Sequence, residues 1–244
     1  MNRITIAALR QMKRDVRKIV GVVVYDYQMA QIVDRAGVDI VSVGDSVGVN
    51  MWGHATEKAI TLEEMLVACR AVRRGVTYAL VSCDVPGAVD DVVGAARALV
   101  SEGGAEMVKV EAGAEEIGAI VQAGIPVWAQ LSGPGALDSG QDITRLVNQA
   151  KALEAAGASL LDFRHSGPEA GPAVARAVSI PVIGGLGGGP WLDGRVRAVV
   201  NAIGYSAAAL DDTADRYANV ARVALEAIAT YADDVRGGRQ VRGK

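Results

Sequence analysis

The stretch AGVDIVSVGDS, residues 36–46, joins an Ala-Gly pair to a nearly continuous apolar run that ends in aspartate and serine. Apolar runs without strict alternation are typical of strands that are covered on both faces, as in parallel sheets. The same opening precedes three further runs, GGAEMV (103–108), AGIPVW (123–128) and AGASLL (156–161). A glycine that ends a helix and leads directly into a strand indicates a chain of repeated β/α units.

Eight such apolar runs can be found, and helical spacing in the segments between them favours a closed (β/α)8 barrel over an open doubly wound sheet. The expected strands are residues 19–26, 39–45, 77–84, 105–112, 126–132, 159–166, 181–189 and 198–205. The expected helices include residues 61–74, 88–101, 142–156 and 169–177. No low-complexity linker divides the chain. We therefore expect residues 1–244 to form a single domain, with an N-terminal helix and a helical tail at 206–231 that caps the barrel or contacts another subunit.

Composition and charge exclude several classes of partner. The formal charge of −3 comes from acids and bases mixed along the chain, so there is no basic stripe and no nucleic-acid partner is expected. The sequence contains no run of about 18 apolar residues, so no membrane span is expected. The N-terminus also lacks the apolar core of a signal peptide. Cys69 and Cys83 lack metal-ligand spacing and are expected to be reduced thiols. These features predict a cytoplasmic protein.

Polar residues gather at the ends of the expected strands, where the active sites of barrel enzymes are built. They are Tyr25, Asp45, Ser46, Asp84, Lys109, Glu111, Gln130, Asp162, Arg164 and His165. Such a set, one or more from each of six strands, predicts a small-molecule site at the C-terminal rim of the barrel.

Asp45, Asp84 and Glu111 come from three neighbouring strand ends. Three carboxylates that converge on a small volume repel one another unless a cation lies among them. Oxygen ligands of this kind favour Mg²⁺ or a similar divalent ion. The alternative is that each acidic residue caps the helix that follows it.

Lys109 and the two histidines can each be interpreted in more than one way. Lys109 lies two residues before Glu111, so both are expected on the inner face, where Lys109 either pairs with Glu111 or binds the carboxylate of a substrate. His54 and His165 are the only histidines, and neither has a partner at the spacing of a catalytic triad or a zinc site. His54 suits a hydrogen bond within its loop, whereas His165 is a candidate for the rim.

The chain resembles ketopantoate hydroxymethyltransferase over roughly residues 18–205. The resemblance rests on residues 18–48 with their VGDS-G segment, on the GH and TLE of residues 53–75, on LVSCDVP, AEMVKVEAG and AGIPVWAQL, and on IPVIGGLGGGPWLDGRV. It implies a (β/α)8 barrel of the phosphoenolpyruvate/pyruvate superfamily, a homo-oligomer, and Mg²⁺-dependent transfer of a one-carbon unit from methylenetetrahydrofolate to 3-methyl-2-oxobutanoate through a metal-bound enolate.

The resemblance also implies roles for single residues. Asp45 and Asp84 look like the Mg²⁺ ligands, and Glu111 looks like the group that holds the metal's water. Ser46 and Lys109 look like binders of the 2-oxo acid, and Tyr25, Gln130 and Arg164 are expected beside them in the substrate site.

Two positions depart from the family. Arg164 stands where the family has a glutamate thought to act as the base, and a guanidinium cannot accept a proton at physiological pH. Gln130 replaces the family's histidine at the end of the fifth strand. The loops after the third and fifth strands also look shorter than in the family.

These departures leave three hypotheses. In the first, aldol chemistry persists and Asp162 or His165 moves the proton. In the second, Arg164 recruits a substrate with an extra carboxylate or phosphate, for a specialised aldol reaction or for a carbon–carbon lyase or mutase of the same superfamily. In the third, the barrel is a non-catalytic paralogue. The acidic cluster argues against the third, because an inert barrel has no need of desolvated carboxylates.

Overall fold

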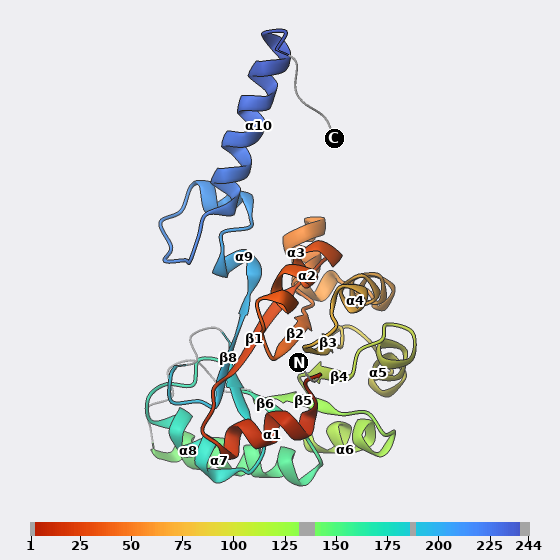
Figure 1. Ribbon diagram of the computed structural model, residues 1–244. Coiled ribbons are helices and arrows are strands. Elements are labelled where there is room, and N and C mark those ends of the chain that lie inside the picture. The colour runs from red at the N-terminus through yellow and green to blue at the C-terminus, as the bar shows by residue number, and fades with distance from the viewer. Residues whose placement is uncertain (1–2, 132–139, 186–188, 240–244) are drawn as a thin grey trace. The chain divides into compact units, whose positions relative to one another are not determined.

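The computed structural model describes residues 3–131, 140–185 and 189–239. The chain divides into two compact units, residues 1–197 and residues 198–244. Within the described residues, eight parallel strands pair in chain order and close into a barrel, which confirms the (β/α)8 prediction (Figure 1). They are β1 (Ile19–Val24), β2 (Ile40–Val43), β3 (Leu80–Asp84), β4 (Met107–Val110), β5 (Val127–Gln130), β6 (Leu160–Asp162), β7 (Val182–Gly184) and β8 (Gly194–Ala198).

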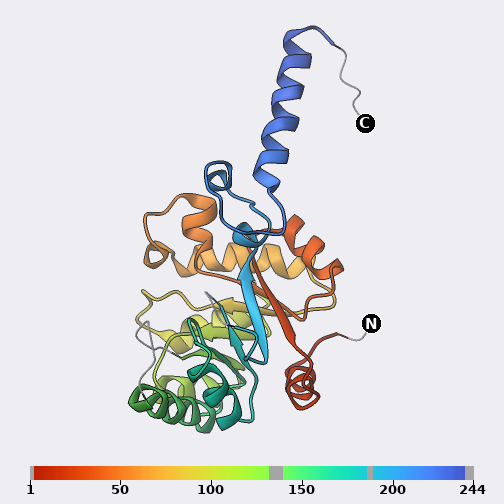
Figure 2. The ribbon, with the colours of Figure 1, turned by 90° about the vertical axis from the view of Figure 1, so that its left-hand side faces the viewer.

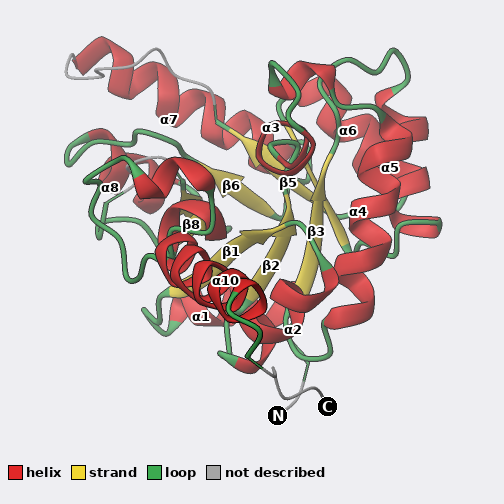
Figure 3. Cartoon of the chain, turned by 90° about the horizontal axis from the view of Figure 1, so that it is seen from above, coloured by secondary structure: helices red, strands yellow, loops and turns green. Residues whose placement is uncertain are grey.

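Helices surround this barrel on the outside (Figure 3). They are α2 (Tyr27–Arg35), α3 (Val47–Trp52), α4 (Leu62–Gly75), α5 (Val92–Ser101), α6 (Ala114–Gln122), α7 (Gly140–Ala155) and α8 (Ala170–Ala177), with the 3-10 turn η1 (Glu57–Ala59) before α4. Local capping sets several of their starts, because Asp26, Thr61 and Asp91 each accept a hydrogen bond from the backbone N–H three residues on. Asp45 and Asp84 precede α3 and α5 but are not their N-caps, which are Ser46 and Asp91.

The predicted position of the eighth strand was wrong. Residues 198–205 were expected to form it, but β8 is Gly194–Ala198 and residues 199–202 form the short helix α9 (Val199–Ala202). β8 lacks a continuous apolar run because Arg195 and Arg197 alternate with its inner residues. Figures 1 and 2 show β8 beside β1, and a Cβ at Gly194 would lie 2.2 Å from the backbone oxygen of Ile19. Only glycine therefore permits the close approach that seals the barrel.

The N-terminal end of the barrel is filled by apolar side chains and covered by the N-terminal helix α1 (Ile6–Arg14). Leu9 and Met12 of α1 pack against the first residues of the strands, including Ile19, Leu80 and Trp128. The ammonium of Lys13 donates hydrogen bonds to the carbonyl oxygens of Ala175 and Ile180 and to Asp193 Oδ2, which ties α1 to the barrel wall. This end is a packed core, so the chemistry is left to the opposite, C-terminal end.

The second unit contains α9, the turn η2 (Ala207–Leu210) and α10 (Val220–Arg236), which begins at the capping side chain of Asn219. These helices lie where the sequence predicted a helical tail, and the single domain over 1–244 stays a prediction. Among the described residues, no helix has the length and apolar character needed to cross a bilayer. Cys69 and Cys83 are buried free thiols, as expected. Ser132 and residues 186–188, which the sequence placed in the fifth and seventh strands, lie outside the described residues.

Candidate active site

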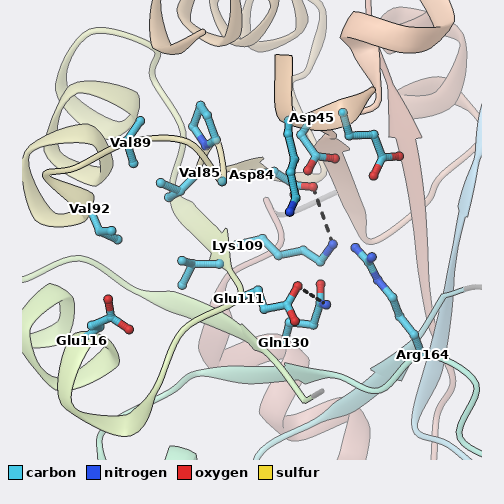
Figure 4. A pocket seen from close by; sticks show the side chains of 15 residues that line it. Asp45, Asp84, Val85, Val89, Val92, Lys109, Glu111, Glu116, Gln130 and Arg164 are labelled. Carbon is cyan, nitrogen blue, oxygen red and sulfur yellow. Dashed lines mark hydrogen bonds and ion pairs between the residues drawn. The ribbon is translucent and has the colours of Figure 1, made fainter. Parts of the chain in front are cut away.

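A cavity of about 360 Å³ opens at the C-terminal end of the barrel (Figure 4). Predicted site residues from the ends of β2 to β6 line it, namely Asp45, Asp84, Lys109, Glu111, Gln130 and Arg164. The period-two alternation of β4 places Lys109 and Glu111 on this side, as predicted. The strand-end pattern in the sequence therefore identified one coherent cavity.

Asp84 and Lys109 form the buried core of the site. The two residues are partners in the register of β3 and β4, and Lys109 Nζ lies 3.6 Å from Asp84 Oδ2, with each side chain only 10% exposed. The other oxygen, Asp84 Oδ1, is buried and has no hydrogen-bond partner among the described residues. Burial, which the charge of Lys109 only partly offsets, raises the pKa of Asp84 to about 6. A buried carboxylate oxygen without a partner calls for a donor or a cation.

Asp162 holds two cations in place. Its Oδ2 accepts from Lys109 Nζ at 3.2 Å and from Arg164 Nε at 3.1 Å, and its Oδ1 accepts from the backbone N–H of Gly185 at 3.3 Å. Burial alone would lower the pKa of Lys109, but attraction to Asp84 and Asp162 outweighs it and raises that pKa. Lys109 also lies 5.6 Å from the ring centre of Trp128, its register partner on β5. Lys109 is therefore a fixed cation at the floor of the cavity.

The charge of the cavity wall favours a cation. The side chains that line it include two more carboxylates than cationic groups: the acids are Asp45, Glu57, Asp84, Glu111 and Glu116, and the bases are Lys58, Lys109 and Arg164. Burial is the main cause that raises the pKa of Asp45, followed by repulsion from Glu57. The charge of Asp45 in turn helps to raise the pKa of Asp84. Asp45 and Asp84, with the unpartnered oxygen of Asp84, thus fit a divalent cation.

The predicted set of three ligands is not assembled, however. Among the described residues, no three His, Cys, Asp or Glu side chains are grouped closely enough to hold a metal ion. Glu111 lines the same cavity, but its Oε2 accepts a hydrogen bond from Gln130 Nε2 at 2.8 Å (Figure 4). The structure therefore groups Glu111 with Gln130, and the two remaining candidate ligands are Asp45 and Asp84.

The comparisons with known proteins can be set against this geometry. The family model of ketopantoate hydroxymethyltransferase matches residues 3–240. The chain belongs to this family. Curated relatives named 3-methyl-2-oxobutanoate hydroxymethyltransferase include one from Chloroflexus aurantiacus, 35% identical over 97% of this chain and 90% of the relative, and one from Geobacillus thermodenitrificans, 35% identical over 93% and 88%.

The barrel fold of this ketopantoate hydroxymethyltransferase family member is similar to that of several solved structures. A putative phosphonomutase from Burkholderia cenocepacia has a TM-score of 0.65 and 18% identity, with 96% of this chain and 98% of that chain covered. A phosphonopyruvate hydrolase crystallised with oxalate and Mg²⁺ has a TM-score of 0.64 and 16% identity over 97% and 88%. At such low identity these likenesses show the fold alone. As a ketopantoate hydroxymethyltransferase family member, the chain is an enzyme of the transferase class that forms carbon–carbon bonds.

Two other residues that the sequence placed in the substrate site, Tyr25 and Ser46, are not among the residues that line the cavity. The hydroxyls of Tyr25 and Ser46 hydrogen-bond at 2.9 Å, and Asn50 Nδ2 donates to Tyr25 Oη at 3.1 Å. Burial is the main cause that raises the pKa of Tyr25. Gly44 lies next to this group, because a Cβ there would be 3.1 Å from Ser46 Oγ and 3.8 Å from Asp84 Oδ2. The cluster thus braces the turn that carries Asp45.

The two histidines do not line the cavity either. His165 is exposed and has a φ of 51°, which turns its backbone away from the strand direction of β6. His54 Nε2 lies 3.2 Å from Glu64 Oε1, so it makes the loop contact expected of it.

Sequence reasoning missed part of the cavity wall. Glu57, Lys58 and Glu116 contribute charges, and Val85, Val89 and Val92 form an apolar side (Figure 4). Glu57 and Lys58 lie in η1, a turn with no strand-end signal. Glu116 could have been found as a first-turn acid of α6, since it accepts from the N–H of Gly113 at 3.1 Å.

Proposed function

We propose that this chain catalyses aldol-type transfer of a one-carbon unit to C3 of a 2-oxo acid, with methylenetetrahydrofolate as the donor. One observation carries the proposal: the buried Asp84 carboxylate lies against Lys109, keeps one oxygen without a partner, and lines a cavity with Asp45. The curated relatives carry the name 3-methyl-2-oxobutanoate hydroxymethyltransferase, which makes that monocarboxylic acid the first substrate to test.

Asp45 and Asp84 are the residues that would hold a divalent cation, with Mg²⁺ the first choice for carboxylate oxygens. When bound, such an ion would polarise the 2-oxo group and stabilise the negative charge that develops on its oxygen. The excess of carboxylates in the cavity wall and the unpartnered oxygen of Asp84 support this assignment.

Lys109 and Gln130 position charge around the reacting acid. Lys109 forms ion pairs with Asp84 and Asp162 and adds a fixed positive charge close to where the acid's carboxylate would lie. Gln130 orients the carboxylate of Glu111 by the hydrogen bond at 2.8 Å. The apolar side chains of Val85, Val89 and Val92 exclude water from the other side of the cavity.

The proton at C3 needs a carboxylate that is accessible from the cavity. Arg164 cannot accept it, and Asp162 is 1% exposed with its Oδ2 already bound to two cations. Glu111 lines the cavity and is held by Gln130. We assign Glu111 to this step: its carboxylate takes the C3 proton. One of the two carbon–nitrogen bonds of the donor's methylene group opens, and the electron pair left on C3 forms the new bond to that methylene, either directly or after water has released it as formaldehyde. Water breaks the second carbon–nitrogen bond and supplies the hydroxyl oxygen, and both donor nitrogens leave with a proton.

The test is a product assay with Mg²⁺, 3-methyl-2-oxobutanoate and methylenetetrahydrofolate, followed by NMR. We expect a hydroxymethylated 2-oxo acid that forms only with all three components and not with the Asp84→Asn variant. No product with either this acid or a dicarboxylic 2-oxo acid would contradict the proposal. A cytoplasmic location and a homo-oligomeric state belong to the same proposal, and the two free buried thiols support the first.

A further inference from the structure

Arg164 is a cationic group of the cavity wall, next to Lys109, that the proposed reaction does not use. Its side chain is 31% exposed and lines the cavity, and Figure 4 shows it reaching from the end of β6 toward the ammonium of Lys109. Only its Nε is engaged, at 3.1 Å from Asp162 Oδ2, and its two terminal amino groups make no hydrogen bond to any residue that the structure describes. The forked end of the guanidinium thus has donors to offer to a ligand.

Pairing with Asp162 does not by itself account for a cationic side chain at position 164. Asp162 already has Lys109 Nζ at 3.2 Å and the N–H of Gly185 at 3.3 Å, so its charge and both of its oxygens have other partners. The shared acceptor also brings two cations close together, since Lys109 Nζ and Arg164 Nε can be no more than about 6 Å apart when both bind one oxygen. The nearby carboxylates of Asp162 and Asp84 offset the repulsion between these two charges, so the reason for a ligand at this place is the unused donors at the forked end of Arg164.

We infer that the acceptor is a dicarboxylic 2-oxo acid of four or five carbons, whose second carboxylate binds the terminal amino groups of Arg164. This inference rests on the proposed function, because the first carboxylate and the 2-oxo group are assigned to the Asp45, Asp84 and Lys109 side of the cavity. A guanidinium fork matches a carboxylate in a bidentate way, whereas a branched apolar side chain offers it nothing. The spacing of the two cations is one that the two carboxylates of such an acid can bridge.

The same assignment accounts for the chemistry at this position. The resemblance to the family implies a carboxylate base at the position of Arg164, so proton removal at C3 has to do without that base in this chain. In the four-carbon acid the second carboxylate is attached to C3 itself, and pairing it with a guanidinium disperses its negative charge. C3 is then flanked by two electron-withdrawing groups, and its proton is more acidic than that of a carbon that bears only alkyl groups. Glu111 suffices as the acceptor of this proton.

The experiment compares matched acids that differ only in the second carboxylate. Binding of 2-oxobutanedioate against 2-oxobutanoate, and of 2-oxopentanedioate against 2-oxopentanoate, is measured by calorimetry with Mg²⁺. We expect at least one dicarboxylic acid to bind about tenfold or more tightly than its partner, the size of a charge-assisted bidentate contact. In Arg164→Gln this preference is lost, and in Arg164→Lys it is partly kept. Because the readout is a ratio, a general disturbance of the cavity cancels.

Two further variants sharpen the result. Arg145→Gln removes an exposed arginine of α7 that pairs with Asp142, and it should leave the ratio unchanged. Lys58→Gln removes another cation of the cavity wall, and a loss of preference there as large as in Arg164→Gln would show overall charge rather than an Arg164 contact. Equal binding of the matched acids to the wild type would overturn this inference and leave the proposed function standing. Binding of none of the four acids would also overturn this inference, whereas the proposed function is tested separately by the product assay with 3-methyl-2-oxobutanoate.

Discussion

The ammonium of Lys109 lies 3.6 Å from Oδ2 of Asp84, and both side chains are nine-tenths buried at the end of the cavity where the strands finish. The pair leaves Asp84 Oδ1 without a partner among the described residues. A carboxylate so placed is costly when ionised and alone, and is stabilised when a cation joins it. Most of the expected behaviour of this protein follows from that relationship.

The stability of the metal-free protein should depend on the charge of Asp84. Its folded pKa of about 6 lies above the usual aspartate value of 3.8, so the folded state binds the proton more tightly than the unfolded state. The stability that this proton gives is present below about pH 4 and is lost as pH rises to about 6, by on the order of 3 kcal/mol. Asp84→Asn lacks this loss. Denaturant unfolding of both proteins with a chelator should therefore show the variant gaining relative stability from pH 4 to pH 6, and a constant difference would contradict the pKa.

Metal binding should depend on both aspartates of the cavity. Asp45→Asn and Asp84→Asn each remove a charged ligand oxygen, so we expect calorimetry at pH 7.5 to show Mg²⁺ affinity reduced at least tenfold in each variant. Asp90→Asn, at an exposed acidic residue outside the cavity wall, is the matched control and should bind Mg²⁺ as the wild type does. Unchanged affinity in both cavity variants would remove Asp45 and Asp84 from the metal site.

Asp162 should contribute to stability and to position rather than to proton transfer. Asp162→Asn leaves Lys109 and Arg164 close together with their shared carboxylate gone, and breaking a buried pair in this way costs about 3–5 kcal/mol in the free energy of unfolding. Asp142→Asn, which breaks the exposed pair with Arg145, should cost less than about 1 kcal/mol. If the two variants lose the same stability, Asp162 is not the anchor of these cations.

Glu111 should be needed for proton removal but not for metal binding. Glu111→Gln is expected to slow the exchange of the substrate's C3 proton by about 10²–10⁴-fold, the usual contribution of a general base, while Mg²⁺ affinity changes little. Glu116→Gln, at a second glutamate of the same cavity wall, controls for a general loss of negative charge. A similar small effect of both variants on exchange would mean that another group takes the proton.

Much of this site could be predicted from the sequence because strand ends in a β/α barrel meet at one rim. From that rule the sequence alone predicts one rim site for residues that all line a single cavity, namely Asp45, Asp84, Lys109, Glu111, Gln130 and Arg164. It could not show that Asp162 holds two cations, because this depends on the register of β4, β5 and β6 and on side-chain conformations. It also could not find Glu57 and Lys58, which reach the cavity from a turn.

The errors have physical causes of the same kind. β8 was placed too late because Arg195 and Arg197 interrupt its apolar pattern, so the apolar residues of α9 looked more like a strand. The metal site of three carboxylates stays a prediction: Asp45, Asp84 and Glu111 line one cavity, and Glu111 is also hydrogen-bonded to Gln130 on the next strand. Spacing along the chain predicts which face a side chain occupies, whereas its partners are set by neighbours that the sequence does not name.

The most direct test of the central claim is deuterium incorporation at C3, followed by NMR in deuterated water with Mg²⁺, for 3-methyl-2-oxobutanoate and for 2-oxopentanedioate. We expect exchange that requires both enzyme and metal with at least one of these acids, that is abolished in Asp84→Asn and is retained in Asp90→Asn. Absence of enzyme-dependent exchange with both acids, or equal exchange by Asp84→Asn, would contradict the assignment of enolate chemistry to this cavity.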